Sequence, residues 1–272
     1  MPMPQNKNVE IFPAGFYAQA KRVGVCPECG GEGVFLSQDG SFRTFAKICP
    51  CRMENQRINL YNSCCLPSHF FEATLDNFQL TRLHEIKKAV EAAKEKVKEF
   101  REGKVKKGLL FYGPPGTGKT RLICALLRSL MLELGVSCRF IEFAEFLNQI
   151  KRGYDAGEYE GELLAPLLKV EVLAIDELGK GRKTDWESAI LDQIISKRYF
   201  TRKVTFFTTN YALEGSFKKK NNKESEVAEK ESFLHLKDRI DLRVYSRICE
   251  MCDFVGMDAA DFRVHPMQVV SF

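Results

Sequence analysis

The stretch GPPGTGKT, residues 113–120, has the residue types and the spacing of a loop that binds phosphate groups. Its glycines let backbone amides approach the phosphates, Lys119 can reach the β and γ phosphates of a nucleotide, and the Thr120 hydroxyl can ligate Mg²⁺. An apolar run precedes the stretch and a helical pattern follows it, as this motif requires. We therefore expect ATP and Mg²⁺ to bind at Gly113, Pro114, Pro115, Gly116, Thr117, Gly118, Lys119, Thr120 and Arg121.

Two further apolar runs end in polar residues that could complete such a site. The run VEVLAIDE, residues 170–177, ends in Asp176, which can hold Mg²⁺ through water, and in Glu177, which can deprotonate the attacking water. The run TFFTTN ends in Thr208, Thr209 and Asn210. A polar side chain there can position water beside the γ-phosphate, although asparagine also favours plain turns. We expect Lys119, Asp176, Glu177 and Asn210 to act in ATP hydrolysis.

Three arginines recur at four-residue intervals in LKDRIDLRVYSRICEMC. At helical spacing Arg239, Arg243 and Arg247 share one face, next to a row of core residues, Leu236, Ile240, Val244 and Ile248. We interpret Arg247 as an arginine finger that reaches the γ-phosphate of a neighbouring subunit, with Arg243 and Arg239 as alternatives. A finger that acts in trans requires a homo-oligomer, whereas the competing interpretation is a solvated basic face.

Six of the ten cysteines lie between Cys26 and Cys65. The pairs C-x-x-C and C-x-C can supply four thiolates to a tetrahedral Zn²⁺ through Cys26, Cys29, Cys49 and Cys51. Such a metal would fold a segment that is poor in apolar residues. Two alternatives stay open: the cysteines are reduced and buried without metal, or one ligand is replaced by Cys64, Cys65 or His69. Cys249 and Cys252 fit helical spacing and are expected to pack in the core.

Alternating short apolar strands and helices predict an α/β fold, a parallel sheet between helices. Strands are expected at 109–112, 138–143, 170–176 and 203–210, and helices at 81–103, 119–135, 144–168 and 185–200. Residues 1–65 show little periodic structure and are interpreted as a cysteine-rich zinc-binding segment, with an ATPase domain at 66–272 that begins with an extended linker at 66–80. The charged residues 216–232 are expected to form a surface insertion.

Composition limits the class of protein. Hydrophobic residues make up 44% of the 272, no apolar run reaches the roughly 18 residues of a membrane span, and the N-terminus does not resemble a secretory signal. We therefore expect a cytoplasmic protein with no membrane partner. The net charge of +5 is compatible with nucleic acid. Phosphates could be contacted by Lys180, Arg182, Lys183, Lys151 and Arg152, although plain surface solvation explains these residues equally well.

The segments FFEATLDNF, GPPGTGKT, LAIDELGKG, FFTTN and LRVYSRICEMC follow the order seen in AAA+ ATPases of the DnaC/DnaI helicase-loader and IstB-like group. The chain resembles this group over about residues 66–265. The resemblance implies a P-loop NTPase fold of AAA+ type with a five-stranded parallel sheet. It also implies that Asn210 is the sensor 1 residue, that Arg247 is the box VII arginine, and that residues 71–78 lie near the adenine. Because 25 residues follow Arg247, we expect no C-terminal helical lid, and Arg263 is a weak candidate for sensor 2.

The functional interpretation is an ATPase that loads a replicative helicase, similar to DnaC. ATP binding would assemble subunits around single-stranded DNA or on the hexameric helicase, and hydrolysis at subunit interfaces would release them. Zinc-bearing N-terminal segments occur in loaders of this group, where the N-terminal region contacts the helicase. The alternatives are an IstB-like transposition helper that binds duplex DNA and a small-molecule P-loop kinase, for which no second substrate pocket is visible.

Overall fold

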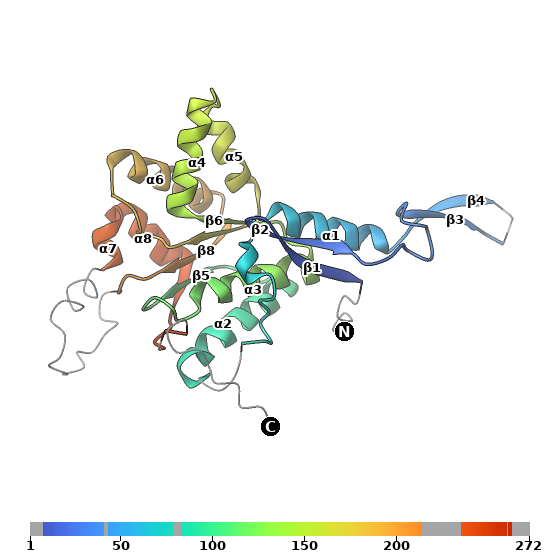
Figure 1. The fold of residues 1–272 in the computed structure, drawn as a ribbon, viewed down its shortest axis with the longest axis horizontal. Coiled ribbons are helices and arrows are strands. Elements are labelled where there is room, and N and C mark those ends of the chain that lie inside the picture. Colours follow the sequence, from blue (N-terminus) through green and yellow to red (C-terminus); the bar gives the residue numbers. More distant parts are fainter. Residues whose placement is uncertain (1–7, 41–42, 79–82, 214–234, 260, 263–272) are drawn as a thin grey trace.

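The computed structural model describes residues 8–40, 43–78, 83–213, 235–259 and 261–262. Its centre is a parallel sheet in the order β6-β7-β8-β5-β9 (Figure 1). The strands are β5 (Gly108–Tyr112), β6 (Cys138–Glu142), β7 (Val172–Asp176), β8 (Val204–Thr209) and β9 (Cys252–Gly256). This sheet confirms the predicted P-loop NTPase fold of AAA+ type.

The apolar runs alternate between two layers, because successive side chains of a strand point to opposite faces. In β5, Phe111 packs into one buried cluster and Leu110 into the other. In β7, Ala174 and Ile175 divide in the same way. Strands buried on both faces are continuous apolar runs, which is why the sequence located them.

Helices cover both faces of the sheet (Figure 1). One layer contains α1 (Cys51–Ser63), α2 (Leu83–Arg101) and α3 (Lys119–Leu134). The other contains α4 (Phe143–Asp155), α5 (Glu160–Lys169), α6 (Asp185–Phe200), α7 (Leu236–Arg239) and α8 (Leu242–Met251). No helix in the described ranges is long and apolar enough to cross a membrane.

Local signals explain several helix ends. Gly135 takes a left-handed conformation with φ 71° and ends α3, as predicted. Thr184 begins α6 with a capping box, since its Oγ1 accepts a bond from the Glu187 amide at 3.2 Å. These caps satisfy backbone groups that the first and last turns leave without partners.

The segment with little predicted periodicity is more regular than expected. It contains the hairpins β1 (Val9–Ala14)–β2 (Tyr17–Arg22) and β3 (Val34–Gln38)–β4 (Thr44–Ile48), followed by α1. Figure 1 shows β3 and β4 projecting away from the sheet. The prediction of little periodic structure was wrong because these strands are short and α1 is mostly polar, so they give only a weak periodic signal in the sequence.

The α1 helix packs directly on the layer of helices that covers the parallel sheet. Ile58 and Tyr61 belong to the same buried cluster as the apolar residues of α3. The Cys64 carbonyl accepts a bond from the Phe140 amide at 2.8 Å, which pairs part of the edge strand β6. The linker that follows contains the short 3-10 helix η1 (Ser68–Phe70). The domain boundary at residues 65/66 stays a prediction.

Two corrections concern the last helical segment. The expected single helix divides at Ile240, and Asp241 caps α8 by accepting a bond from the Arg243 amide at 2.7 Å. Arg239 therefore lies on α7 and does not share a helical face with Arg243 and Arg247. Cys252 opens strand β9 and is buried, whereas Cys249 is exposed. The expected core packing is therefore confirmed for Cys252 and wrong for Cys249, and the two cysteines do not share a helix. The core row Leu236, Ile240, Val244 and Ile248 is confirmed as buried.

Three other expectations lie outside the described residues. They are the charged insertion at 216–232, the helix start at Thr81 and the sensor 2 candidate Arg263.

Candidate nucleotide-binding site

The phosphate-binding loop joins β5 to α3, so its amides and the helix N-terminus face the same space. Gly116 and Gly118 have φ values of 77° and 89°, which glycine adopts without a steric penalty. The Lys119 side chain lies back on the loop, where its Nζ donates to the Gly113 carbonyl at 2.8 Å and to the Pro114 carbonyl at 2.6 Å. Only 6% of Lys119 is exposed. The loop therefore holds a nearly buried ammonium group where phosphates are expected.

Asp176 lies at the carboxyl end of β7, beside the first turn of α3. The Thr120 hydroxyl donates to Asp176 Oδ1 at 3.0 Å, and the Thr208 hydroxyl donates to the same oxygen. Burial raises the pKa of Asp176 to about 6, while the two hydroxyl donors act in the opposite direction. A hydroxyl and a carboxylate are hard oxygen ligands, so Thr120 and Asp176 fit Mg²⁺. The cation would supply the positive charge that this buried carboxylate lacks.

Glu177 is held in an unusual backbone conformation directly after Asp176. Its φ of 54° is rare for a residue other than glycine. The Thr208 hydroxyl accepts a bond from the Glu177 amide at 3.0 Å, and the Glu177 carboxylate accepts one from Lys180 Nζ. The carboxylate in turn raises the pKa of Lys180. The expected general base is therefore placed at the site but paired with a lysine.

Thr208 contributes more to this edge of the sheet than the sequence indicated. Its hydroxyl contacts both residues of the carboxylate pair, whereas the predicted sensor 1 residue, Asn210, follows the end of β8 and is exposed. The signal in the sequence was a pair of threonines at the end of a buried apolar strand. A hydroxyl group that is 1% exposed needs a hydrogen-bond partner.

Among the described residues, the contacts of Arg247 do not lead to the nucleotide site of its own chain. Its Nη1 donates to Asp192 Oδ1 at 2.6 Å and to Ser196 Oγ at 2.7 Å, both on α6. Its guanidinium carbon lies 5.9 Å from the centre of the Phe200 ring, which is 74% exposed. Arg243, one turn earlier on α8, is exposed.

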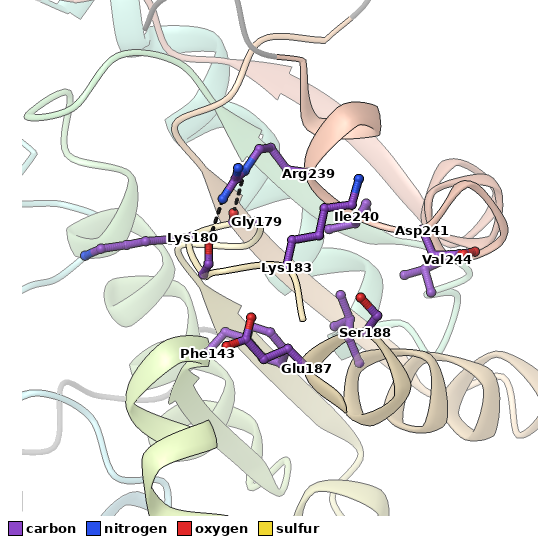
Figure 2. A pocket seen from close by; sticks show the side chains of 12 residues that line it. Phe143, Gly179, Lys180, Lys183, Glu187, Ser188, Arg239, Ile240, Asp241 and Val244 are labelled. Carbon is purple, nitrogen blue, oxygen red and sulfur yellow. Dashed lines mark hydrogen bonds between the residues drawn. The ribbon is translucent and has the colours of Figure 1, made fainter. Parts of the chain in front are cut away.

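The third arginine has a structural role beside the site. Arg239 Nε and Nη2 donate to the carbonyls of Gly179 and Gly181 at 3.1 and 2.6 Å, so α7 fastens the loop that follows Glu177 (Figure 2). Its guanidinium also lies 5.3 Å from the Tyr211 ring centre. The cavity in Figure 2 is about 20 Å³, close to the volume of one water, so it does not hold a second substrate. The role of Arg239 as an alternative finger stays a prediction.

The basic residues considered for DNA contacts are exposed near this loop. Lys180, Arg182 and Lys183 lie in the loop between β7 and α6. Lys151 Nζ, on α4, lies 5.0 Å from the ring centre of Trp186, the second residue of α6. Arg152 pairs with Glu145 at 2.6 Å and is partly neutralised.

The structure brings the four predicted zinc ligands together at the base of the β3–β4 hairpin. All four Sγ atoms lie within 4.8 Å of one another, with Cys26–Cys49 at 3.6 Å and Cys29–Cys51 at 3.3 Å. Zn–S bonds of about 2.3 Å in a tetrahedron require sulfur separations of roughly 3.8 Å. The Gly33 amide donates to Cys29 Sγ at 3.2 Å, and such a bond orients and stabilises a thiolate that binds a metal.

The alternative ligands lie elsewhere. The Cys64 side chain is fully buried in the cluster shared by α1 and α3, Cys65 Sγ donates to the Ser63 carbonyl, and His69 packs edge-on against Phe70. The donor set of the four clustered thiols therefore fits Zn²⁺ without these residues.

The sequence profile of the family described as "IstB-like ATP binding protein" matches residues 71–220. The replicative helicase loader DnaC of Escherichia coli (strain K12) is 33% identical over 127 residues, which are 46% of this chain and 51% of DnaC. The uncharacterized protein YqaM of Bacillus subtilis (strain 168) is 27% identical over 179 residues, 63% of this chain and 56% of YqaM. The chain thus spans about half the length of these two relatives.

Solved structures show the same fold. A crystal structure of the DnaC helicase loader superposes with a TM-score of 0.55 at 29% identity, covering 70% of this chain and 98% of that one. A crystal structure of DnaI superposes with a TM-score of 0.53 at 24% identity, covering 72% and 93%. At that identity, the likeness to DnaI concerns the fold alone.

Proposed function

Because the chain belongs to the family of IstB-like ATP-binding proteins, we propose that it is an ATP-hydrolysing, DnaC-like loader of a hexameric replicative helicase. One observation carries the nucleotide chemistry: Lys119, Thr120 and Asp176 converge where the phosphate loop meets β7. The choice of a loader is supported by the DnaC relative and by the DnaC structure, which this chain covers almost completely.

The chain's residues divide the work of hydrolysis. The loop amides and Lys119 bind the β and γ phosphates, and Thr120 and Asp176 hold the Mg²⁺ that neutralises them. Glu177 removes a proton from the attacking water. Thr208 fixes the position of Asp176 relative to Glu177 through its two hydrogen bonds. Asn210, directly after β8, is the proposed sensor of the γ-phosphate.

Arg247 is proposed to complete the site of a neighbouring subunit. Its own partners are on α6, so it must act in trans, and it must exchange its pairing with Asp192 for the γ-phosphate. An arginine that stabilises the transition-state charge is worth about 10³- to 10⁵-fold in kcat. ATP hydrolysis would therefore depend on a homo-oligomer.

Single-stranded DNA and the helicase are the proposed partners. The exposed cations at Lys180, Arg182 and Lys183 can follow a phosphate backbone, with an affinity that falls as salt rises. The zinc-binding segment that we propose at the four cysteines would hold the β3–β4 hairpin in place to contact the helicase. The alternative is an IstB-like transposition helper, for which the match to the family of IstB-like ATP-binding proteins is the support.

Mixing two inactive variants tests both the chemistry and the assembly. We expect Glu177→Gln and Arg247→Ala each to lower the DNA-stimulated ATPase rate by at least about 100-fold. In a mixture, Arg247 of the first variant faces the intact Glu177 of the second, so activity should return. Arg101→Ala is the matched control. Arg101 is an exposed arginine at the end of α2, and it pairs with Glu133 at the end of α3. Failure of the mixture to recover activity would exclude a finger in trans.

The nucleic acid in the same assay separates the functions. Stimulation by single-stranded DNA, together with capture of the hexameric helicase in a pull-down, is the result expected of a loader. Stimulation by duplex DNA alone, without helicase binding, would assign the transposition-helper role instead. ATP turnover that ignores DNA and Arg247→Ala would contradict both and return attention to a small-molecule kinase.

A further inference from the structure

The segment after β9 crosses the phosphate-binding loop. We call its described residues, 257–259 and 261–262, the C-terminal strap. The Met257 amide donates to the Tyr112 carbonyl at 2.8 Å, and the Phe262 amide donates to the Gly116 carbonyl at 3.1 Å. Because Tyr112 precedes the loop and Gly116 lies in its middle, these two bonds hold the strap along the loop.

The strap and the loop approach each other so closely that only glycine fits on the loop side. A Cβ atom added at Gly113 would lie 2.1 Å from the Met257 carbonyl oxygen. One added at Gly116 would lie 2.0 Å from the Asp261 carboxyl group. These loop glycines are therefore required by the strap as well as by phosphate binding.

The strap places an aromatic ring at the entrance to α3. A Cβ atom added at Gly118 would lie 3.9 Å from both the Phe262 ring and the Phe78 ring. Phe78 comes from the linker before α2 and is 6% exposed, whereas Phe262 is half-buried. The Phe78 ring, from the linker before α2, and the Phe262 ring, from the strap after β9, thus both lie next to Gly118.

Phe78 and its neighbour Asn77 also contact Arg121, in the first turn of α3. The Arg121 guanidinium lies 5.0 Å from the Phe78 ring centre, and Arg121 Nη2 donates to the Asn77 carbonyl at 3.2 Å. Phosphates bound at the N-terminus of α3 would bring the ribose and base beside the loop, where the Phe78 and Phe262 rings lie next to Gly118. The partly exposed ring in that position is Phe262.

We propose that Phe262 is a base-contacting residue of the nucleotide site, forming with Phe78 an aromatic wall on which a purine base stacks. The proposal rests on the proposed function, in which the loop binds ATP. Stacking on an aromatic side chain strengthens binding without reading hydrogen-bond donors and acceptors. The wall therefore selects large bases over small ones and separates ATP from GTP only weakly.

The test compares ATP with inorganic tripolyphosphate, which carries the phosphates but no base. Isothermal titration with Mg²⁺ present is expected to show about tenfold weaker ATP binding by Phe262→Ala, with unchanged tripolyphosphate binding. Phe262→Trp should retain ATP affinity, and Phe262→Leu, which keeps the apolar packing, should lose it. Phe16→Ala is the matched control, because the Phe16 side chain is 89% exposed on the β1–β2 hairpin.

Two results of this titration would refute the base wall, and a third would refute the proposed function. Equal ATP affinity for Phe262→Ala and the unchanged protein would overturn the base wall. Equal weakening of ATP and tripolyphosphate would also overturn it, because the strap would then act by shaping the loop. Absence of ATP binding by the unchanged protein would instead refute the proposed function.

Discussion

Replacement of Asp176 by asparagine is expected to stabilise the nucleotide-free protein while it removes Mg²⁺-dependent ATP binding. Asp176 is 5% exposed, and its carboxylate accepts hydrogen bonds from the Thr120 and Thr208 hydroxyls. Burial of this negative charge is the largest influence on its pKa. Asparagine has nearly the same shape, can still accept from a hydroxyl group and carries no charge.

The magnitude follows from the pKa of Asp176, which burial raises from 3.8 to about 6. Each pKa unit corresponds to about 1.4 kcal/mol, so at neutral pH the buried charge costs about 3 kcal/mol of unfolding free energy. A change of this size raises Tm by about 6 °C in a domain of this length. The value is an upper limit, because asparagine does not reproduce both hydroxyl bonds of a carboxylate.

The pH dependence has a definite sign. The folded state binds the Asp176 proton more tightly than the unfolded state, so this group destabilises the fold as pH rises from about 4 to about 7. Asparagine does not titrate in this range. The stability advantage of Asp176→Asn should therefore be small near pH 4, grow between pH 4 and 7, and remain constant above pH 7.

Thermal unfolding from pH 4 to 8, without nucleotide, Mg²⁺ or chelator, measures this difference. Asp155→Asn is the control, because Asp155 is an exposed aspartate at the end of α4. Adding Mg²⁺ and ATP at pH 7.5 should then raise the Tm of the unchanged protein and leave Asp176→Asn unaffected. A variant that is less stable than the unchanged protein at pH 7.5, or a difference that does not vary with pH, would refute the reasoning.

Three further predictions concern other parts of the molecule. Lys180→Ala should raise the DNA-free ATPase rate by up to about fivefold, because a partly exposed ion pair worth under about 1 kcal/mol no longer restrains Glu177; an unchanged rate would mean that the pair does not restrain the base. Arg198→Met should lower the unfolding free energy in urea by at least about 3 kcal/mol, since Arg198 is 1% exposed and donates to four backbone carbonyls and Thr205. A loss no larger than that of the exposed control Arg202→Met would show that water replaces these bonds. Elemental analysis should find one zinc ion per purified chain, lost in Cys29→Ser and retained in Cys249→Ser, whose cysteine is exposed and outside the cluster; an equal zinc content in both variants would exclude the four-thiol site.

Much of the parallel sheet could be predicted because its signals are local. Strands buried on both faces must be apolar throughout, so β5, β7 and β8 were visible as runs. Strand β9 was hidden, because its five residues, CDFVG, form neither a continuous apolar run nor a strict alternation and become a strand only when they pair with β5. The break between α7 and α8 did have a local signal, an aspartate that can cap the second helix, but the four-residue spacing of the arginines concealed it.

The structure of the N-terminal segment could also be predicted only in part from its sequence. The cysteine spacing predicted which four thiols would cluster, since only a few residues separate the members of each pair. It did not predict that α1 would pack on α3 or that the Cys64 carbonyl would pair with strand β6. Contacts between residues that are far apart along the chain leave no periodic trace in either segment.

The sequence alone determined the phosphate loop, the carboxylates at the end of β7 and the order of strands β5 to β8 with the helices between them, because each depends on residue types within one short segment. The tertiary structure decided which polar group reaches Asp176, which carbonyls accept from Arg239, and what lies over the loop. A parallel sheet brings together the carboxyl ends of strands that are distant in sequence, and only that packing sets which side chains meet there.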